Sequence, residues 1–417
     1  MISNESIIKD PSLAPSGERK IQWVDQHSPL LNALREKYLN KESIGGLKIG
    51  IIVPLEAKTG FLATVLADAG AEVVVTGTGP AYVQDDVAAA LVARGLRVYA
   101  ISGVSDDEFR KYLEKVLEFQ PDVLIDDRAE FVRMLHTDYQ HLLSKVRGAS
   151  EQTTSGVTRL LAMQEQGVLK LPVIAANNAM CKHFFDNRYG TGQSVWTAIM
   201  SATNLFIAGR EVVIIGYGWC GKGLARRAKG LGARVTVVEV DPVKGLEAWA
   251  DGFEVHPLEK CASYGDIFVT STGSPHAIDT QHIEQMKDGA ILANAGGLDD
   301  EINVKGLEAL AKEKREARRY ITEYVLPDGR RIHLLADGFL VNLVAGDGHP
   351  VEIIDMTFAV QALGMRHVAL HYDQLGPGVH DFPKELDEEI ARLKLKSLGM
   401  GVGSLTKEQI NYLHSWR

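Results

Sequence analysis

The fold of this chain is decided by one glycine-rich stretch, Glu211-Val-Val-Ile-Ile-Gly216-Tyr-Gly218-Trp-Cys-Gly221-Lys-Gly223. A run of β-branched residues ends abruptly in glycines, and a segment rich in helix-forming residues follows it. Gly216, Gly218 and Gly221 have the G-x-G-x-x-G spacing of a dinucleotide-binding turn. In such a turn the glycines allow a tight bend, close approach to a pyrophosphate and packing of helix on strand. The pyrophosphate then lies at a helix N-terminus, where free N–H groups favour an anion.

A second β-branched run, Arg234–Val238, leads into Glu239, which lies 18 residues after Gly221 (239 − 221). At that position a carboxylate binds the adenosine ribose hydroxyls of NAD and repels the additional phosphate of NADP. The strand–helix–strand context therefore predicts a Rossmann domain with NAD as its cofactor. The alternative is a fold of the same shape whose nucleotide site is empty.

Length and composition exclude several classes of protein. The chain has 417 residues, which suggests about two to three domains, and its net charge of −9 argues against nucleic acid as a partner. Cys181, Cys220 and Cys261 form no C-x-x-C pair, so we expect neither disulfides nor a metal site. No apolar run approaches the ~20 residues that span a bilayer, and the first residues show no leader pattern. We therefore expect a cytoplasmic protein with no membrane partner.

Alternating strand and helix patterns before the glycine-rich stretch indicate another α/β domain. The last of these strands ends in Asp126-Asp127, and open α/β sheets bind ligands at the carboxyl ends of their strands. The runs that read as strands in this part are Lys48–Val53, Ala71–Val75, Arg97–Ile101 and Val123–Asp127.

These patterns predict an α/β protein with two doubly wound domains and a helical C-terminal segment. Residues 1–185 and 348–385 form a predicted substrate-binding domain, and residues 186–347 form the Rossmann NAD-binding domain inserted in it. Residues 386–417 form a predicted helical oligomerisation segment. Within it Leu386–Leu398 is amphipathic and charged, which is typical of either a solvated helix or a contact between subunits.

The junction of the two predicted domains has a distinctive motif, Asn177-Asn-Ala-Met-Cys-Lys182-His-Phe-Phe-Asp186-Asn187-Arg-Tyr-Gly190. It resembles the Asn-Asp-Ser-x-x-Lys-x-x-Phe-Asp-Asn-x-Tyr-Gly segment of the S-adenosylhomocysteine hydrolases. Because further stretches match in the same order along nearly the whole chain, the chain is identified as a member of that family. The matching stretches are Gly148–Gly156, Gly216–Gly223, Glu239–Pro242, Phe268–Gly273, Leu335–Leu343 and Gly348–Pro350.

The resemblance implies a reaction in which NAD, bound tightly and recycled in each turnover, accepts hydride from the 3′-carbon of a nucleoside ribose. The resulting ketone makes the 4′-hydrogen acidic enough for a carboxylate to remove, and the 5′ substituent is expelled. In the family, water then adds to the enone and the ketone is reduced. The cofactor supplies the redox step, while the protein supplies positions and bases.

The resemblance also assigns roles to single residues. Lys182 matches the catalytic lysine beside the 3′-hydroxyl, Asp186 matches its carboxylate partner, and Asp127 matches the proposed 4′ base. Asn177 and Asn187 match the amides that orient ribose and nicotinamide. The family motifs place the cofactor contacts at Gly216, Gly218, Gly221, Glu239, Asn187, Thr153, Thr154, Ser155, Thr272, Asn294 and Asn342.

The chain departs from the family where the purine, the sugar and the 5′ substituent are held. The family's His-Met-Thr-x-Glu is here Pro54-Leu-Glu56-Ala-Lys58, so proline replaces the proposed proton donor to the leaving group. Gly297 replaces a second histidine in an Asn-x-Gly-His motif. The Asp-Asp-Gly-Gly-Asp loop is here Asp126-Asp127-Arg128-Ala129-Glu130, and the ribose-binding glutamate is Gln152. The expected substrate-binding residues are Gln152, Lys182, Asp186, Lys58, Gln84 and His349.

Because the redox residues are intact and the 5′ end is altered, we expect hydride chemistry at an adenosine-type nucleoside with a changed 5′ substituent. The favoured hypothesis is a 5′-hydroxyl dehydratase, a lyase that expels water and leaves a 4′,5′-unsaturated sugar. Hydroxide leaves less readily than a thiolate, so an acid must protonate it, and Glu56 is the expected catalytic donor. His276 and Glu130 are weaker candidates. Lys58 replaces a glutamate that contacts the exocyclic amine, and a lysine only donates, so it suits a keto purine or pairs with Glu56.

Two alternatives stay open. The first alternative to the dehydratase is a genuine adenosylhomocysteinase, which splits S-adenosylhomocysteine to adenosine and homocysteine. The second alternative is a non-catalytic NAD-binding regulatory paralogue. Intact Lys182 and Asp186 argue against the second alternative, because a binding module has no need of them. The resemblance also implies a homo-oligomer, either a dimer or a tetramer.

Overall fold

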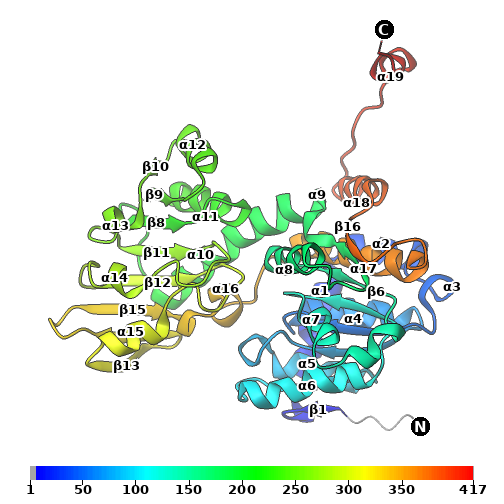
Figure 1. Cartoon of the computed structure of the whole chain (residues 1–417), viewed down its shortest axis with the longest axis horizontal. Helices are drawn as coiled ribbons and strands as arrows, with labels where there is room; N and C mark the ends of the chain where they lie inside the picture. Colours follow the sequence, from blue (N-terminus) through cyan, green and yellow to red (C-terminus); the bar gives the residue numbers. More distant parts are fainter. Residues whose placement is uncertain (1–5, 417) are drawn as a thin grey trace.

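The computed structural model describes residues 6–416 and places them in two lobes, each built on one sheet (Figure 1). The first lobe is coloured blue, cyan and orange, and the second lobe is green to yellow. Residues 1–5 and residue 417 lie outside the described residues. The prediction that the N-terminus has no leader falls on these residues, so the structure does not test it. Parallel strands alternate with helices in both lobes, so the predicted α/β fold class is confirmed.

The first lobe is built on eight parallel strands: β1 (Ile7–Ile8), β2 (Lys48–Ile52), β3 (Glu72–Thr76), β4 (Arg97–Ala100), β5 (Val123–Asp126), β6 (Gly148–Glu151), β7 (Pro172–Ala175) and β16 (Gly378–Asp381). Their order is β1-β4-β3-β2-β5-β6-β7-β16. Runs of isoleucine and valine form the central strands, because β-branched side chains pack well on a sheet that is covered on both faces. The order reverses between β2 and β5, and doubly wound sheets bind ligands at such a reversal.

Helices connect and cover these strands. In α4, Glu56 caps the N-terminus by accepting the N–H of Lys58 at 3.0 Å, and the residues from Lys58 to Leu66 are buried. The strand and helix order expected between residues 48 and 127 is present. The helices of this lobe are α1 (Ala14–Gln26), α2 (Pro29–Lys37), α3 (Lys41–Ile44), α4 (Ala57–Asp68), α5 (Asp85–Ala93), α6 (Asp106–Glu118), α7 (Glu130–His136), α8 (Thr154–Glu165) and α17 (Val351–His371).

The second lobe has its own eight strands: β8 (Glu211–Ile215), β9 (Arg234–Val238), β10 (Glu254–Val255), β11 (Ile267–Thr270), β12 (Ala290–Asn294), β13 (Glu313–Arg318), β14 (Ile321–Val325) and β15 (Arg331–Leu335). Their order is β10-β9-β8-β11-β12-β15-β14-β13, and β14 runs antiparallel to β13 and β15. The charged sequence of β13 has no apolar alternation, so the pattern of residues did not indicate this strand. The covering helices are α10 (Thr191–Thr203), α11 (Trp219–Gly230), α12 (Pro242–Ala250), α13 (Leu258–Cys261), α14 (Thr280–Ile283), α15 (Val304–Leu310) and α16 (Val341–Val344).

Two segments join the lobes. The first passes through α9 (Met180–Lys182) and a π-helical segment, His183–Gly190, into α10, and the second leads from α16 to α17. In α17, Asp355 accepts the N–H groups of Leu30 and Leu31 at 3.0 and 2.8 Å, which returns the chain to the first lobe. The helical pattern expected from His349 onward then gives way to β16, a strand too short for its residue pattern to indicate.

The C-terminal part divides into two helices, α18 (Lys384–Ser397) and α19 (Lys407–Leu413). Ile390 of α18 is buried in the core of the first lobe, so half of the predicted oligomerisation segment 386–417 belongs to that lobe's fold. In contrast, α19 lies away from both lobes (Figure 1). Within residues 6–416, no helix is long and apolar enough to cross a membrane, and no cluster of metal-ligating side chains is present.

Candidate active site

The fold brings four of the expected site residues, Glu56, Asp127, Gln152 and Asn177, to one edge of the first sheet. β2 and β5 are neighbours, and their carboxyl ends lead into Glu56 and Asp127 respectively. β6 and β7 follow in the same direction and lead into Gln152 and Asn177. Parallel strands end at a common edge, which explains why residues from four separate loops share one site.

Lys182 is almost completely buried, with 4% of its surface exposed. Its Nζ lies 2.7 Å from Asn187 Oδ1, 3.1 Å from Asn177 Oδ1 and 3.2 Å from Asp186 Oδ1. A buried ammonium needs such partners, because the loss of water costs on the order of several kcal/mol without them. Lys182, Asp186, Asn187 and Asn177 thus form one cluster, which we call the redox cluster.

A local change of helix geometry helps to assemble this cluster. Residues His183–Gly190 form a π-helical segment between α9 and α10. Such wide turns within helices occur frequently at functional sites. Here the wide turn directs both Asp186 and Asn187 toward the ammonium of Lys182, although these two residues are neighbours in the sequence. The motif in the sequence indicated the residues, but it contained no signal for the π-helical backbone.

Asp186 links the redox cluster to α17. Thr357 Oγ1 donates to Asp186 Oδ2 at 2.7 Å, and His349 Nδ1 lies 3.4 Å from Asp186 Oδ1. Burial alone would raise the pKa of this carboxyl, but the Lys182 ammonium and then His349 outweigh burial and hold the pKa below its ordinary range. Asp186 therefore remains an anion near neutral pH. Thr357 was missed by the sequence reasoning, because it lies 171 residues from Asp186 and in no recognised motif.

The two asparagines of the redox cluster are held by Thr154. Asn187 Nδ2 donates to Asn177 Oδ1 at 3.2 Å, and Asn177 Nδ2 donates to Thr154 Oγ1 at 3.0 Å. Each amide is also bound to Lys182, so the planes of both amides are fixed before any ligand arrives. Fixed donors and acceptors of this kind position a substrate without further ordering.

Asp127 has the properties of a general base. It is 4% exposed, and its Oδ1 has no hydrogen-bond partner among residues 6–416. The buried Gln152 Oε1 likewise has no partner in the described chain. Buried acceptors are seldom left unpaired, so both atoms mark places where a ligand group can donate. Burial raises the pKa of Asp127, although the neighbouring Arg128 cation counteracts part of that rise.

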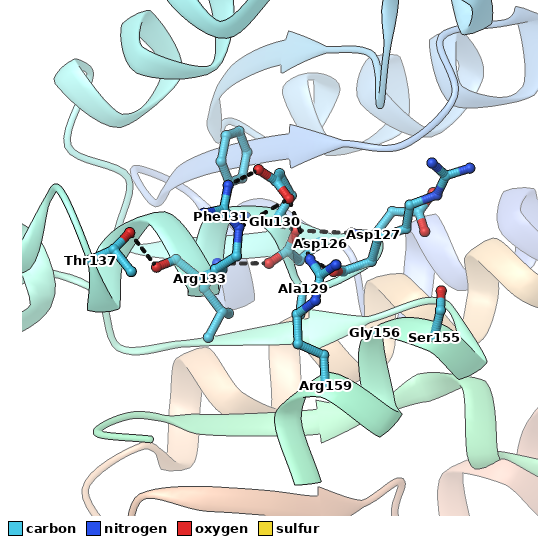
Figure 2. A network of polar contacts seen from close by, with 12 residues as sticks. Asp126, Asp127, Ala129, Glu130, Phe131, Arg133, Thr137, Ser155, Gly156 and Arg159 are labelled. Carbon is cyan, nitrogen blue, oxygen red and sulfur yellow. Dashed lines mark hydrogen bonds and ion pairs between the residues drawn. The ribbon is translucent and has the colours of Figure 1, made fainter. Parts of the chain in front are cut away.

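Asp126 shapes the loop that carries Asp127 (Figure 2). Its carboxylate accepts the backbone N–H groups of Asp127, Phe131 and Val132 at 2.9, 3.2 and 2.9 Å. Complete burial raises the pKa of Asp126 to about 7, despite these three donors. Asp126 therefore acts on the loop and on the start of α7, and Asp127 alone of the two keeps an unpartnered carboxylate oxygen.

The same loop contains strained backbone. Arg128 and Ala129 have positive φ angles of 59° and 53°. The left-handed region costs a non-glycine residue about 1 to 2 kcal/mol. The buried Glu151 stabilises this conformation by accepting the N–H groups of Arg128 and Ala129 at 3.1 and 2.9 Å. Glu151 was not among the expected site residues, although it lies at the end of a buried strand and within the matching stretch Gly148–Gly156.

Arg128 reaches across to the second lobe. Its Nη1 and Nη2 donate to Asp299 Oδ2 and Oδ1 at 2.9 and 3.2 Å. The Tyr82 hydroxyl also donates to Asp299 and accepts the N–H of Leu340 at 3.1 Å. The Tyr82 ring centroid lies 5.5 Å from the guanidinium carbon. We call Tyr82, Arg128 and Asp299 the clamp. The sequence contained no signal for it, because its partners are 171 and 217 residues apart.

Glu56 and Lys58 form a buried ion pair, with 2.7 Å between Oε2 and Nζ. Lys58 Nζ also donates to the carbonyl oxygen of Asp347 at 2.6 Å. Pairing with Glu56 was one of the two interpretations of Lys58 from the sequence, and the structure contains that pair. A cavity of about 790 Å³ lies beside it and is lined by five of the expected site residues, namely Glu56, Lys58, Gln84, Asn342 and His349. Asp127, Gln152 and the residues of the redox cluster do not line this cavity.

Neither position at which the family has a histidine carries a proton donor. Pro54 only accepts, through its carbonyl oxygen, from the Thr59 hydroxyl at 2.6 Å. A Cβ on Gly297 would lie 3.0 Å from Ser155 Oγ, so Ser155 lies directly beside this position. Of the weaker acid candidates, His276 is exposed and Glu130 forms ion pairs with arginines of the first lobe.

The glycine-rich turn fits the pyrophosphate of NAD. Gly216 has a φ of 96°, and a Cβ on Gly221 would lie 1.9 Å from the Gly216 carbonyl oxygen, so neither position accepts a side chain. A Cβ on Gly218 would meet no protein atom within 4 Å, which leaves space for a phosphate. Glu239 follows β9, and its Oε2 accepts the N–H of Tyr217 at 2.7 Å, so its carboxylate lies beside the turn.

Other expected cofactor residues lie along the carboxyl edge of the second sheet. The N–H and hydroxyl of Thr272 donate to the buried Glu301 at 2.8 and 3.0 Å. Asn342 donates to Ser194 Oγ at 3.0 Å, and its buried Oδ1 has no partner within residues 6–416. Glu301 was missed by the sequence reasoning. It holds the loop after β11, in which Thr272 lies, at the reversal of this sheet.

Asn294 differs from these residues because its amide is fully used by the protein. Its Nδ2 donates to the carbonyl oxygens of Leu298 and Gly338 at 2.7 and 3.0 Å. Its Oδ1 accepts the Thr270 hydroxyl at 3.0 Å and the Gly296 N–H at 2.8 Å. Asn294 therefore holds the loop that contains Gly297, and its contact with the cofactor stays a prediction.

Comparisons with known proteins agree with this geometry. The family profile described as S-adenosyl-L-homocysteine hydrolase matches residues 5–138, and the profile described as its NAD binding domain matches residues 187–348. A protein named S-inosyl-L-homocysteine hydrolase from Methanopyrus kandleri is 49% identical over 413 residues, which cover 99% of this chain and 97% of that protein. A protein named adenosylhomocysteinase from Pyrococcus abyssi is 50% identical over 415 residues, which cover 100% and 98% respectively.

Proposed function

The chain belongs to the S-adenosyl-L-homocysteine hydrolase family and uses NAD, and within that family we propose that it removes water from the 5′ position of a purine nucleoside. The proposed product is a nucleoside with a 4′,5′-unsaturated sugar. One observation carries the proposal: the redox cluster around Lys182 is complete, whereas Pro54 and Gly297 leave the 5′ end without the two imidazoles of the family.

The redox cluster supports transient oxidation of the ribose 3′-carbon. NAD supplies the hydride acceptor for this step when it is bound. The Lys182 ammonium is held by two amide oxygens and by Asp186, and beside a ribose it stabilises the 3′-oxygen as that oxygen loses its proton. An intact cluster of this kind also argues against the non-catalytic alternative.

Asp127 supports the elimination that follows. Its unpartnered Oδ1 accepts the proton from C4′, and the electrons of that C–H bond form the 4′,5′ double bond as the 5′-oxygen leaves. The C4′ proton and the expelled hydroxide together make one water, so the step needs no additional proton. The proton reaches the 5′-oxygen either from Asp127 itself or, as an alternative in which Glu56 is protonated and does not accept from the base, from Glu56. Glu56→Gln separates these routes, because it stops only the second.

The ion pair of Glu56 and Lys58 supports recognition of the purine edge. Its carboxylate accepts and its ammonium donates, and both side chains line the 790 Å³ cavity. The 6-oxo group and the N1–H of hypoxanthine have the complementary pattern when the oxygen faces Lys58. We infer a 6-oxopurine nucleoside as the preferred substrate, and adenosine as the competitor in which acceptor and donor are exchanged.

Hydrolysis of a homocysteine thioether is the second candidate function. The observation that favours it is the identity of about half of all residues, over nearly full length, to proteins named S-inosyl-L-homocysteine hydrolase and adenosylhomocysteinase. In this reading the groups that protonate the thiolate differ from the family histidines. The two functions share the redox cluster and differ only at the 5′ end.

We also infer a division of tasks between the lobes. The first lobe binds the nucleoside and the second binds NAD, with bounds near residues 185 and 348.

We further infer a homo-oligomer from α19 and the segment before it. Leu405, Tyr412 and Leu413 are exposed there by 54%, 79% and 65%, and exposed apolar side chains that gather in one place are typical of subunit contacts. Sedimentation of the purified protein tests this inference, and a monomer would contradict it.

Incubation with matched substrates tests the proposed function. The purified protein is given adenosine, inosine, S-adenosylhomocysteine and S-inosylhomocysteine in separate reactions. We expect loss of one water from a nucleoside, detected by mass spectrometry, with inosine converted faster than adenosine. Release of a free thiol from either thioether, without loss of water from any nucleoside, would overturn the dehydratase and support the hydrolase.

A further inference from the structure

We propose that Arg128 determines which 5′ substituents the enzyme accepts, because the clamp fills the space beside Asp127 that a large substituent would need. This inference rests on the proposed placement of C4′ at Asp127. It goes beyond the proposed function by naming the residue that limits the size of the substituent, and it assigns that task to a contact between the two lobes.

The clamp joins two loops that carry residues of the proposed 5′ end, one with Asp127 and the other with Gly297. Arg128 directly follows Asp127, the proposed 4′ base. Its guanidinium ends on Asp299, which lies two residues after Gly297, where the family has a histidine near the leaving group. C5′ is bonded to C4′, so with C4′ at Asp127 a 5′ substituent begins within one bond of the proposed base, and we place it toward the clamp.

The clamp is built as a rigid wall. The Arg128 side chain is 18% exposed and forms two parallel hydrogen bonds to Asp299, a geometry that fixes the plane of the guanidinium. Tyr82 is 4% exposed, places its ring beside that plane and holds Asp299 through its hydroxyl. A hydroxyl on C5′ needs little space beyond C5′, whereas a thioether side chain must displace this wall.

The backbone indicates that the Arg128 side chain has a function. Arg128 and Ala129 adopt left-handed conformations, which glycine adopts without strain and in which other residues are rare. The family loop quoted above has glycines at this place. Strained positions persist where the surrounding structure enforces them, and here Glu151 holds both N–H groups while Asp299 holds the guanidinium.

Equilibrium binding tests the proposal without any need for turnover. The ligands are 3′-deoxyadenosine, 3′-deoxyinosine and their 5′-deoxy-5′-methylthio derivatives, so that each pair shares a base, differs only at C5′ and lacks the 3′-hydroxyl at which turnover begins. We expect the wild-type protein to bind the 5′-hydroxyl ligand at least tenfold more tightly than its methylthio partner. In Arg128→Gly this ratio should fall at least tenfold. An unchanged ratio in Arg128→Gly, for both bases, would overturn the proposal.

Two further variants separate the wall from a general effect on folding. Arg128→Lys keeps a long cationic side chain and should retain most of the wild-type ratio. Asp299→Asn weakens the clamp from the other lobe and should lower the ratio by a smaller factor than Arg128→Gly. A purely structural role would weaken both ligands of a pair equally and lower the thermal midpoint, whereas we expect Arg128→Gly to keep its midpoint, because glycine relieves the strained φ.

The binding test of Arg128 and the substrate test of the dehydratase can fail independently of each other. If no nucleoside loses water but the binding ratio shifts in Arg128→Gly, the dehydratase fails and the assignment of Arg128 survives. If water is lost and the ratio does not shift, the dehydratase survives and the assignment of Arg128 is wrong.

Discussion

Around Lys182 the site consists of residues that lie close together in the sequence, whereas around Arg128 it consists of residues from two lobes. The contacts of Lys182 with Asn177, Asp186 and Asn187 span at most five residues. The contacts of Asp299 with Arg128 and Tyr82 span 171 and 217 residues. The comparison teaches that the redox cluster is assembled locally, while the control of the 5′ substituent that we propose for Arg128 depends on how the lobes meet.

Removal of the Lys182 ammonium should break the redox end and give the largest effect. In Lys182→Met the amide oxygens and Asp186 lose their cation, and the 3′-oxygen loses its acid–base partner. We expect both turnover and transient NADH absorbance to fall by at least ~10³-fold. The matched control is Lys384→Met, at a side chain that is 84% exposed, which should change neither quantity. Unchanged turnover in Lys182→Met would show that the redox site is assigned to the wrong residue.

Asp127→Asn should separate oxidation at C3′ from the elimination at C4′ and C5′. The amide keeps the size of the side chain but cannot take the C4′ proton, so product formation should fall about 10²-fold or more. Oxidation at C3′ does not use this carboxyl, and transient NADH absorbance should persist. The measurement is NADH absorbance and product mass on the same sample. Loss of the NADH signal together with product would contradict the division into two ends.

The pH dependence of the free energy of unfolding should sharpen the contrast between the carboxyl of Asp126, in the loop of Arg128, and that of Asp186, in the redox cluster. Burial raises the pKa of Asp126 to about 7, whereas an unfolded aspartate titrates near pH ~3.9. Between these values the folded chain binds more protons at Asp126 than the unfolded chain, so this group makes stability fall as pH rises. The pKa of Asp186 is lowered, so its contribution is complete above pH ~3.9 and is lost only in stronger acid.

Calorimetry checks this expectation between about pH 5 and pH 7. The thermal midpoint of the wild-type protein should decrease as pH rises, and the decrease should be smaller in Asp126→Asn. Asp122→Asn, at a partly exposed carboxyl of the same lobe, serves as the control and should follow the wild type. Equal slopes in the wild type and Asp126→Asn would show that Asp126 does not hold a proton in the folded state.

Thr357→Val should give the smallest effect. Valine has nearly the same shape but cannot donate to Asp186, so one 2.7 Å hydrogen bond is lost while Lys182 and His349 remain. Loss of about 1 kcal/mol of transition-state stabilisation corresponds to a roughly fivefold decrease in kcat/KM. The variant is compared with Thr158→Val, an exposed threonine on α8, by steady-state kinetics. A decrease of the same size in both variants would remove Thr357 from the site.

Much of the fold could be predicted, because its signals act over short distances. The β-branched runs at Lys48–Ile52 and Glu211–Ile215 formed strands, and the glycine spacing after the second run formed the nucleotide turn. The edge strands β13 and β16 were missed, because all residues of β13 but Ala317 are charged and β16 is short. In such strands the partner strand decides the conformation more than the residues themselves.

The site was predicted in part for the same reason. Motif matches indicated Lys182, Asp186 and Asn187, and the structure brings these three into one cluster because they lie close together along the chain. Their roles in the reaction stay predictions. Glu56 was expected as a proton donor, with a pair to Lys58 as one of two interpretations of that lysine, and the structure contains the pair and also engages Glu56 at the N-terminus of α4. Its role as a proton donor stays a prediction, and Glu56→Gln tests it.

The sequence by itself determined the family, the NAD-binding turn and the redox cluster. Those features depend on residue types at fixed short spacings, which the covalent chain imposes directly. Only the tertiary structure decided that Arg128 and Tyr82 meet Asp299, that Asp127 keeps an unpartnered oxygen and that Glu151 holds the strained loop. Such contacts depend on the packing of strands and lobes that are distant in the sequence, and no local spacing encodes that packing.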